Sequence, residues 1–280
     1  MLIVKIPLGI SGCEKSPNEI LEFLKEISVN EKGREINFQK LDLEEIHLDN
    51  SNLKLSNELI YKNSFDCFET KPRTIFLGGD HSVSYSTTRA FLDYCKDLGK
   101  KPCLIVFDAH ADFGEENNSF ATNQSWLGKL ISEGFPTENI LLVGVRSHQK
   151  KDLDFLKKSK IQQINLNSIE EDIDNIADTI MEFAGGKELY VSVDIDVVDS
   201  AFAPATDYPE PGGLTSRQFI YLIQRINKMK NLRAVDIVGI NSEKANFENK
   251  ISKFPSQVRE KDKDNLTIKL GAKILSELIY

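Results

Sequence analysis

Residues 103–112 read CLIVFDAHAD, an apolar run that ends abruptly in alternating polar side chains. The first five of these residues predict a buried strand, because a short apolar run with β-branched members suits a parallel sheet. Two other runs have the same form: residues 74–77 precede GGDHS, and residues 189–193 precede DID. Functional residues gather beyond the carboxyl ends of the strands of open parallel sheets, so the three motifs are expected to converge.

Strand-like and helix-like segments alternate along the chain, which predicts an α/β fold with a parallel sheet. Helices are expected to begin near Ser16 and to cover residues 82–96, 125–133, 151–157, 169–183, 216–228 and 265–278. Further strands are expected over residues 1–6, 140–145, 161–164 and 234–240. For residues 46–71 we predict a short hairpin and a helix. There is no linker or repeat, so residues 1–280 are assigned to a single domain.

The composition narrows the class of function. The chain has 280 residues, 40% of them hydrophobic, and a net charge of −8. An acidic chain of this kind is not expected to bind nucleic acid, which requires a basic surface. No apolar run approaches the length that spans a membrane, and we expect neither a membrane partner nor a signal peptide. Cysteines without a CxxC pair predict reduced, buried thiols in a cytoplasmic protein.

The polar motifs contain residues that bind metal ions. Asp108, His110 and Asp112 alternate, so their side chains point the same way in an extended segment, and Asp194 and Asp196 share this geometry. Together with His81 in the first motif, they form the ligand set of a two-metal hydrolytic centre. Bridging carboxylates can hold two cations about 3.5–4 Å apart. Oxygen-rich ligands with two histidines suit Mn²⁺, and zinc or iron also fit.

Charge balance supports a pair of cations at these motifs. Four aspartates close together would not all stay ionised without compensation, and two divalent cations cancel their charge. Such cations also produce a nucleophilic hydroxide near neutral pH. The site would favour a cationic electrophile such as a guanidinium.

At these residues the chain resembles the ureohydrolase (arginase and agmatinase) family. The resemblance lies in GGDHS at 78–82, FDAHAD at 107–112 and SVDIDVVD at 192–199, and it extends over 201–204 and 209–214. It is weaker at 143–147 and 236–241. It implies a three-layer α/β/α fold with a mostly parallel central sheet, arginase-like, and a binuclear manganese centre.

The resemblance also assigns roles by position. One Mn²⁺ would be held by His81, Asp108, Asp112 and Asp194, and a second Mn²⁺ would be held by Asp108, His110, Asp194 and Asp196. Asp112 would also act in catalysis by accepting a hydrogen bond from the attacking hydroxide. The reaction would hydrolyse a C–N bond of a small cationic guanidino or amidino compound to urea or formamide plus an amine. Members of the family are often trimers or hexamers, so a homo-oligomer is expected.

The chain departs from the family pattern in the part that handles the substrate. The family usually has a proton-shuttling His about ten residues after the second motif, where this chain has Phe120. It usually has an acidic residue after the strand at 235–238, where this chain has Gly239. His148 is the replacement we consider for proton transfer, with an exposed loop histidine as the alternative interpretation.

Three residues are candidates for substrate binding. Asp207 and Tyr208 stand where Gly-Thr is usual, and Glu243 could reach in from the loop after the last strand. Asp207 or Glu243 would then replace the acidic partner that Gly239 lacks.

Several functions remain open on the sequence alone. Phe120 and Gly239 are also compatible with a non-catalytic homologue that keeps its metals for stability, or with a hydrolase of a different linear amide or amidine. A metal-dependent phosphatase or deacetylase is a third possibility, although the motifs lack the arginines of a phosphate clamp.

Overall fold

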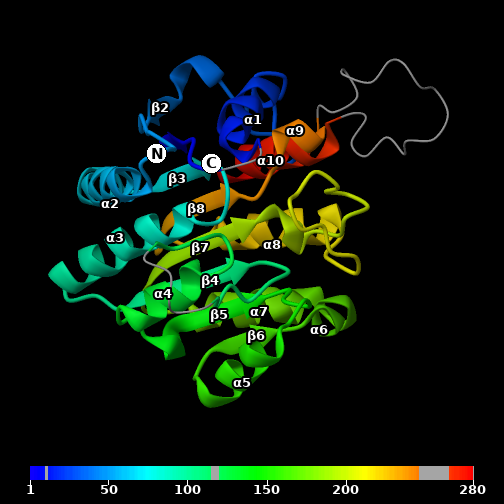
Figure 1. The fold of residues 1–280 in the computed structure, drawn as a ribbon. Coiled ribbons are helices and arrows are strands. Elements are labelled where there is room, and N and C mark those ends of the chain that lie inside the picture. Colours follow the sequence, from blue (N-terminus) through cyan, green and yellow to red (C-terminus); the bar gives the residue numbers. More distant parts are fainter. Residues whose placement is uncertain (10–11, 115–119, 246–264, 280) are drawn as a thin grey trace, which may run out of the picture.

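The computed structural model describes residues 1–9, 12–114, 120–245 and 265–279. Its centre is an eight-stranded sheet with the order β2-β1-β3-β8-β7-β4-β5-β6 (Figure 1). All neighbouring strands in this sheet run parallel, which confirms the predicted parallel α/β fold. The strands are β1 (Leu2–Ile6), β2 (Asp42–Glu45), β3 (Thr74–Gly78), β4 (Pro102–Phe107), β5 (Ile140–Val143), β6 (Gln162–Ile164), β7 (Glu188–Asp194) and β8 (Leu232–Val238).

Helices cover both faces of the sheet and give the three-layer α/β/α architecture (Figure 1). One face packs against α2 (Leu53–Thr70), α3 (Val83–Asp97), α4 (Trp126–Ser132) and α5 (Lys150–Lys158). The other face packs against α1 (Ser16–Leu24), α6 (Leu166–Glu171), α7 (Ile173–Phe183), α8 (Ser216–Ile226) and α10 (Leu266–Leu278).

Strand β4 explains why its sequence is a continuous apolar run. Ile105 and Phe107 belong to the core on the α1 side, while Leu104 and Val106 belong to the core on the α3 side. All four side chains are buried, because a strand inside a sheet with helices on both faces has no solvent side. Each such side chain contributes about 1.5–3 kcal/mol by its burial.

The predicted elements are confirmed to within a few residues at their ends, apart from two segments. The expected helix over 169–183 is two helices, because Asp172 leaves the helical conformation between α6 and α7. Its side chain caps α7 by accepting a hydrogen bond from the backbone N–H of Asn175 at 3.0 Å. An N-capping aspartate of this kind begins a new helix.

The hairpin predicted within residues 46–71 is wrong. That segment holds helix α2 and no strand, and the strand of this region is β2, just before it. Strand β2 reads DLEE and lies at the edge of the sheet, mostly exposed. An edge strand that is mostly exposed does not need apolar residues at alternating positions. The sequence of β2 therefore lacks the pattern from which a strand is predicted.

Two other expectations concern the whole chain. All four cysteines are free and buried, as predicted. None of the helices described is both long and apolar enough to span a bilayer. The assignment of residues 1–280 to one domain stays a prediction.

Candidate metal centre

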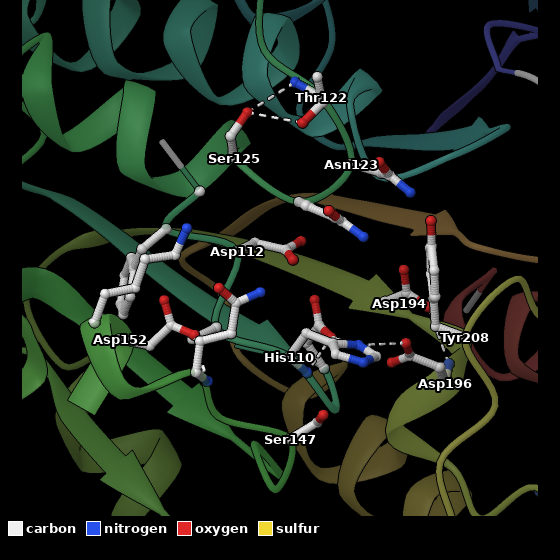
Figure 2. A pocket seen from close by; sticks show the side chains of 17 residues that line it. His110, Asp112, Thr122, Asn123, Ser125, Ser147, Asp152, Asp194, Asp196 and Tyr208 are labelled. Carbon is white, nitrogen blue, oxygen red and sulfur yellow. Dashed lines mark hydrogen bonds and ion pairs between the residues drawn. The ribbon is translucent and has the colours of Figure 1, made fainter. Parts of the chain in front are cut away.

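The three polar motifs lie at the carboxyl edge of the sheet, at the ends of strands in its middle. His81 follows β3, Asp108 follows β4, and Asp194 is the last residue of β7. Strand β7 lies beside β4, and only β8 separates β7 from β3. The order of the strands therefore gathers side chains that are far apart in sequence. Figure 2 shows part of the result, with His110 and Asp196 in contact.

Three carboxylates surround one nitrogen of His81. Its Nδ1 lies 2.9 Å from Asp108 Oδ2, 3.2 Å from Asp112 Oδ2 and 3.4 Å from Asp194 Oδ2. The ligand atoms of His81, Asp108 and Asp112 lie within 4.8 Å of one another, a group that could hold a metal ion. All four side chains are buried, so the group is enclosed by protein.

A second group of ligands forms around His110. Its Nδ1 lies 2.9 Å from Asp196 Oδ2 and 3.5 Å from Asp108 Oδ1. The side chains of Asp108, His110 and Asp196 form the second possible metal-binding group. On the other edge of the ring, Nε2 lies 3.7 Å from Glu210 Oε1. Asp108 is common to both groups, with one oxygen toward each histidine, as a bridging carboxylate requires.

The bonding of these residues fits divalent cations. His81 Nδ1 is buried and forms no hydrogen bond among the described residues, although three carboxylates lie around it. A buried nitrogen that is crowded by three carboxylates and makes no hydrogen bond of good geometry is expected where a cation completes the site. The residues present therefore suit the metal centre that the sequence predicts.

The protonation of the cluster leads to the same conclusion. Burial, together with the charge of Asp108, raises the pKa of Asp112 to about 7 and that of Asp196 to about 6. Burial also raises the pKa of Asp194. Burial alone would lower the pKa of His110, but its hydrogen bonds with Asp108 and Asp196 raise it to about 11. Without cations, the negative charge of these carboxylates is thus balanced by bound protons and by a positively charged His110. Bound divalent cations would neutralise the same charge.

A buried network fixes the ring of His81. Its Nε2 lies 2.9 Å from Ser192 Oγ, which donates a hydrogen bond to Asp236 Oδ1 at 2.8 Å. Tyr190 donates to the other oxygen of Asp236, also at 2.8 Å. When a cation binds at Nδ1, the proton of His81 would lie on Nε2 and would be donated to Ser192 Oγ. Such outer partners orient a metal ligand and hold its tautomer.

Three residues of this network were not predicted from the sequence as site residues: Ser192, Tyr190 and Asp236. The signal that could have found them is polarity inside apolar strands: Asp236 is fully buried in β8, and Ser192 is fully buried in β7. A buried carboxylate needs hydrogen-bond partners, which invites a search for a nearby site.

Asp112 is held in an unusual conformation. Its φ of 50° lies in the left-handed region, which is costly for a residue with a side chain. Trp126 Nε1 donates to Asp112 Oδ2 at 2.9 Å, and Gly128 N–H donates to its carbonyl at 3.2 Å. Helix α4 therefore fixes the orientation of this carboxylate. Trp126, the only tryptophan of the chain, is a further site residue that was not predicted from the sequence.

A cavity of about 350 Å³ adjoins the ligands (Figure 2). Its inner wall consists of metal-ligand candidates, and its outer wall consists of loop residues and the first turn of α5. The described lining is Asp108, His110, Ala111, Asp112, Phe113, Gly114, Thr122, Asn123, Gln124, Ser125, Ser147, Gln149, Lys151, Asp152, Asp194, Asp196 and Tyr208. Among the described residues, the outer wall comes from residues 113–114 and 122–125, from four residues between 147 and 152, and from Tyr208.

The two positions considered for proton transfer lie outside this cavity. Phe120 has 40% of its surface exposed and is absent from the lining, as is the exposed His148. The loop after the second motif instead contributes Thr122 to Ser125, all neutral and polar. The remaining histidine, His47, is exposed at 90% of its side chain. Of the four histidines in the chain, only His81 and His110 belong to the site.

Asp207 is bonded to neighbouring segments and does not line the cavity. Its Oδ1 accepts a hydrogen bond from Asn241 Nδ2 at 2.6 Å and lies 3.3 Å from Lys244 Nζ. Cys13 Sγ donates to Oδ2 at 3.4 Å, and burial and Asp207 raise the pKa of that thiol. The next residue, Tyr208, does line the cavity, with its ring 6.1 Å from that of His110.

In the described part of the segment after β8, residues 239–245, no acid lines the cavity. Gly239 has φ of 81°, and a Cβ built there would lie 2.2 Å from Asp194 Oδ1. Asp194 therefore occupies the space that a side chain at position 239 would need. Glu243 pairs with Lys15 at 2.7 Å and packs against Gly12, and it is not part of the lining.

Arg146 fastens the loop that carries Tyr208. Its Nη2 donates to the carbonyls of Asp196 at 2.8 Å and Glu210 at 2.9 Å, and its Nε donates to that of Pro211 at 3.1 Å. The guanidinium of Arg146 thus connects the backbone at Asp196, a metal-ligand candidate, to the loop that carries Tyr208 at the entrance of the cavity.

An all-parallel sheet with His and Asp side chains gathered at its carboxyl edge defines an α/β protein built around a candidate metal centre. The family model described as "Arginase family" matches residues 3–279. The chain therefore belongs to the arginase family, and the resemblance seen in its motifs is confirmed.

Two relatives illustrate the range of the similarity. Arginase 1, mitochondrial, of Oryza sativa subsp. japonica is 29% identical over 208 residues, which cover 74% of this chain and 54% of the relative. Proclavaminate amidinohydrolase of Streptomyces clavuligerus is 31% identical over 170 residues, which cover 56% of this chain and 50% of the relative. The matched part thus spans about half the length of these relatives.

Solved structures share the fold over almost the whole chain. Formimidoylglutamase of Bacillus subtilis superposes with a TM-score of 0.81 at 22% identity, covering 99% of this chain and 84% of that one. Proclavaminate amidino hydrolase superposes with a TM-score of 0.80 at 23% identity, covering 100% and 90%. At these identities the likeness shows the fold alone.

Proposed function

We propose that this protein is a hydrolase, dependent on two divalent cations, that cleaves a C–N bond of a small guanidino or amidino compound. Membership of the arginase family supports the class of reaction. The names of the relatives differ in substrate, from an arginase to an amidinohydrolase, so they support linear amidines as a class and no single compound.

One observation carries the proposal. Asp108 directs Oδ2 to His81 at 2.9 Å and Oδ1 to His110 at 3.5 Å, so it faces both ligand groups. A carboxylate between two imidazoles, with further aspartates beside each, is the arrangement of a binuclear centre. The mixture of oxygen ligands and two imidazoles supports Mn²⁺. The residues that would hold the two ions are His81, Asp108, Asp112 and Asp194 for one, and Asp108, His110, Asp194 and Asp196 for the other.

The chemistry that the cations supply when bound is the activation of water near neutral pH and the polarisation of the amidine. The side chains of the protein would position the substrate and the attacking water. The cavity holds the substrate beside the ligands, and Tyr208 forms part of its wall near His110. Trp126 holds the carboxylate of Asp112 in place on the inner wall of the cavity. Asp112 is therefore the candidate acceptor of the proton of the attacking water.

The balance of the reaction is simple. Water adds its oxygen to the central carbon of the guanidine or amidine, and the bond from this carbon to the amine nitrogen breaks. The released nitrogen takes a proton, which Asp112 can return. The products are urea and an amine from a guanidine, or formamide and an amine from a formimino compound.

Metal content and product release test the proposal together. The purified chain would be stripped with chelator, reloaded with Mn²⁺, Zn²⁺ or Fe²⁺, and assayed for bound metal by mass spectrometry. Agmatine, arginine, 4-guanidinobutyrate and formiminoglutamate would then be assayed for urea or formamide. We expect two Mn²⁺ per chain and turnover of at least one compound. Fewer than one ion per chain would overturn the metal centre.

A non-catalytic homologue is the second candidate function. The observation that favours it is that neither His47 nor His148 lines the cavity, which leaves no histidine besides the ligand candidates for proton transfer. This function would give two bound ions and no product across a wide panel of guanidines, amidines and amides.

The wider setting of the protein is also a proposal. We propose a homo-oligomer, trimer or hexamer, in the cytoplasm, with a small cationic substrate and neither nucleic acid nor membrane as partner. The family resemblance and the acidic composition support these points. Sedimentation velocity would test the assembly, and a dimer or monomer would contradict it.

A further inference from the structure

We propose that Trp126 is a positioning residue for one of the two cations, because its indole holds the carboxylate of Asp112 and the ring of His81 together. The inference rests on the metal centre of the proposed function and goes beyond it, since it makes the two cation sites unequal. Trp126 would set the affinity of the cation that His81 and Asp112 share. It would leave the affinity of the cation beside His110 unchanged.

The indole contacts Asp112 through one buried hydrogen bond. Trp126 Nε1 donates to Asp112 Oδ2 at 2.9 Å, and the same oxygen lies 3.2 Å from His81 Nδ1. A carboxylate oxygen has two lone pairs, so the indole can hold one side of Oδ2 while a cation binds the other side. Trp126 is fully buried, and a hydrogen bond to a carboxylate is stronger where water is excluded.

The ring of Trp126 also packs against the ring of His81. The two ring centroids are 4.7 Å apart, and the ring planes are inclined by 41°. Ser192 holds the edge of the same imidazole, with its Oγ 2.9 Å from Nε2. The imidazole is thus supported at one edge and on one face, which keeps Nδ1 directed toward Asp112.

The helix that carries Trp126 is fixed to the backbone of the second motif. Gly128 N–H donates to the carbonyl of Asp112 at 3.2 Å. A Cβ at Gly128 would lie 2.2 Å from the carbonyl oxygen of Phe113, so α4 approaches this backbone at a position where only glycine fits. The left-handed φ of Asp112 requires support from its surroundings, and α4 supplies it through backbone and indole together.

The ligand group of His110 has different neighbours. In the described part of the chain, the side chain of His110 contacts the carboxylates of Asp108, Asp196 and Glu210 and the ring of Tyr208. The indole is not among these contacts. The side chain of His110 is also 25% exposed, whereas the indole is fully buried. Two similar sets of ligands therefore have different supports, which predicts an unequal response to the loss of the indole N–H.

Removal of the N–H alone tests the hydrogen bond. Trp126 is the only tryptophan of the chain, so replacement of tryptophan by 3-benzothienylalanine, which has sulfur in place of N–H and nearly the same shape, changes this position alone. Calorimetric titration of the metal-free protein with Mn²⁺ would give a Kd for each ion. We expect one Kd to rise by about tenfold and the other by less than about twofold, because outer partners of metal ligands change affinity by about 10–100-fold. Two unchanged values, or an equal rise in both, would overturn the inference.

Ligand variants identify the ion that is affected. His110→Ala removes the imidazole of the second group and keeps the group of His81, Asp108 and Asp112. In this background the benzothienyl replacement should raise the Kd of the remaining ion by about tenfold. In His81→Ala it should change the Kd of the remaining ion by less than about twofold. The opposite pattern, or an equal rise in both backgrounds, would overturn the inference.

Two further variants separate this role from a general effect on stability. Trp126→Phe also lacks the N–H and should raise the same Kd by about tenfold. Phe135→Leu is the matched control, because Phe135 is buried in the same core as Trp126. In the described part of the chain, the ring contacts of the two ligand histidines involve Trp126 and Tyr208. Phe135→Leu should therefore lower the free energy of unfolding and leave both Kd values within about twofold. A tenfold rise in this control would show that metal affinity follows core stability, and it would overturn the inference.

Metal binding and product release distinguish this inference from the proposed function. An unaltered protein that binds no Mn²⁺ would overturn both. Two bound ions without urea or formamide would refute the hydrolase, while a rise in one Kd in the benzothienyl protein would still support the role of Trp126. Product release with unchanged Kd values in the benzothienyl protein would overturn the role of Trp126 alone.

Discussion

The inner and outer walls of the cavity are built on different principles. The inner wall stands at the ends of β3, β4 and β7, where buried strands fix the backbone and a second layer of polar groups fixes the side chains. The outer wall comes from loops and the start of α5, and several of its side chains are exposed. Rigid strand ends suit chemistry that needs exact distances, and loops suit the choice of substrate.

This comparison predicts that changes to the inner wall have large effects. Asp108→Ala removes the carboxylate shared by both ligand groups. We expect bound Mn²⁺ to fall from two ions to less than one per chain and hydrolysis to fall by more than about 100-fold, since even outer partners of metal ligands change affinity by about 10–100-fold. Metal analysis and urea release measure this. Asp154→Ala, an exposed aspartate on α5, is the control and should retain both ions.

Ser192 tests the layer behind the ligands. Ser192→Ala breaks the connection between His81 and the buried carboxylate of Asp236. We expect Mn²⁺ affinity to fall by about 10–100-fold, because the imidazole loses the partner that orients it. Titration of metal-free protein measures the affinity. Ser64→Ala is a matched control, because the buried hydroxyl of Ser64 has no hydrogen-bond partner in the described part of the chain. Equal affinities in the two variants would contradict the role of the network.

Gly239 tests how closely the inner wall is packed. Gly239→Ala forces a side chain into the left-handed region, which costs about 1–2 kcal/mol, and places a methyl group against Asp194. We therefore expect a loss of stability of that size in denaturant unfolding and a fall of about tenfold in Mn²⁺ affinity. Gly33→Ala has a similar φ of 74° and nothing within 4 Å, so it should lose stability alone. Unchanged metal affinity in Gly239→Ala would show that Asp194 can move without consequence.

His148 gives the smallest expected effect. It is exposed and lies outside the cavity lining, so His148→Ala should change kcat/KM by less than about twofold, as is usual for surface substitutions. Steady-state kinetics across the pH range measure this. A tenfold loss would support the hypothesis that His148 carries a proton.

The same division explains what the sequence could predict. An apolar strand that ends in His or Asp fixes both the element and the position of the side chain, so the motifs around His81, Asp108 and Asp194 located the inner wall. The outer wall depends on contacts made only in the fold. Asp207 meets Asn241, which is 34 residues away, and no local pattern signals that pairing. The polar strand β2 and the break at Asp172 were not predicted for a similar reason. Strand β2 is set by its position at the edge of the sheet, and the break is set by a capping hydrogen bond, and neither produces a hydrophobic periodicity in the sequence.

Arg146 holds the Tyr208 side of the cavity entrance in place. Its guanidinium holds backbone oxygens of Asp196, Glu210 and Pro211, so the entrance and the floor beneath it move as one piece. Closing a flap at Tyr208 would require these bonds to be released while the arginine stays partly buried, which is unfavourable. We therefore expect the Tyr208 side of the entrance to stay in place while small molecules enter and leave, with no hinge in this loop.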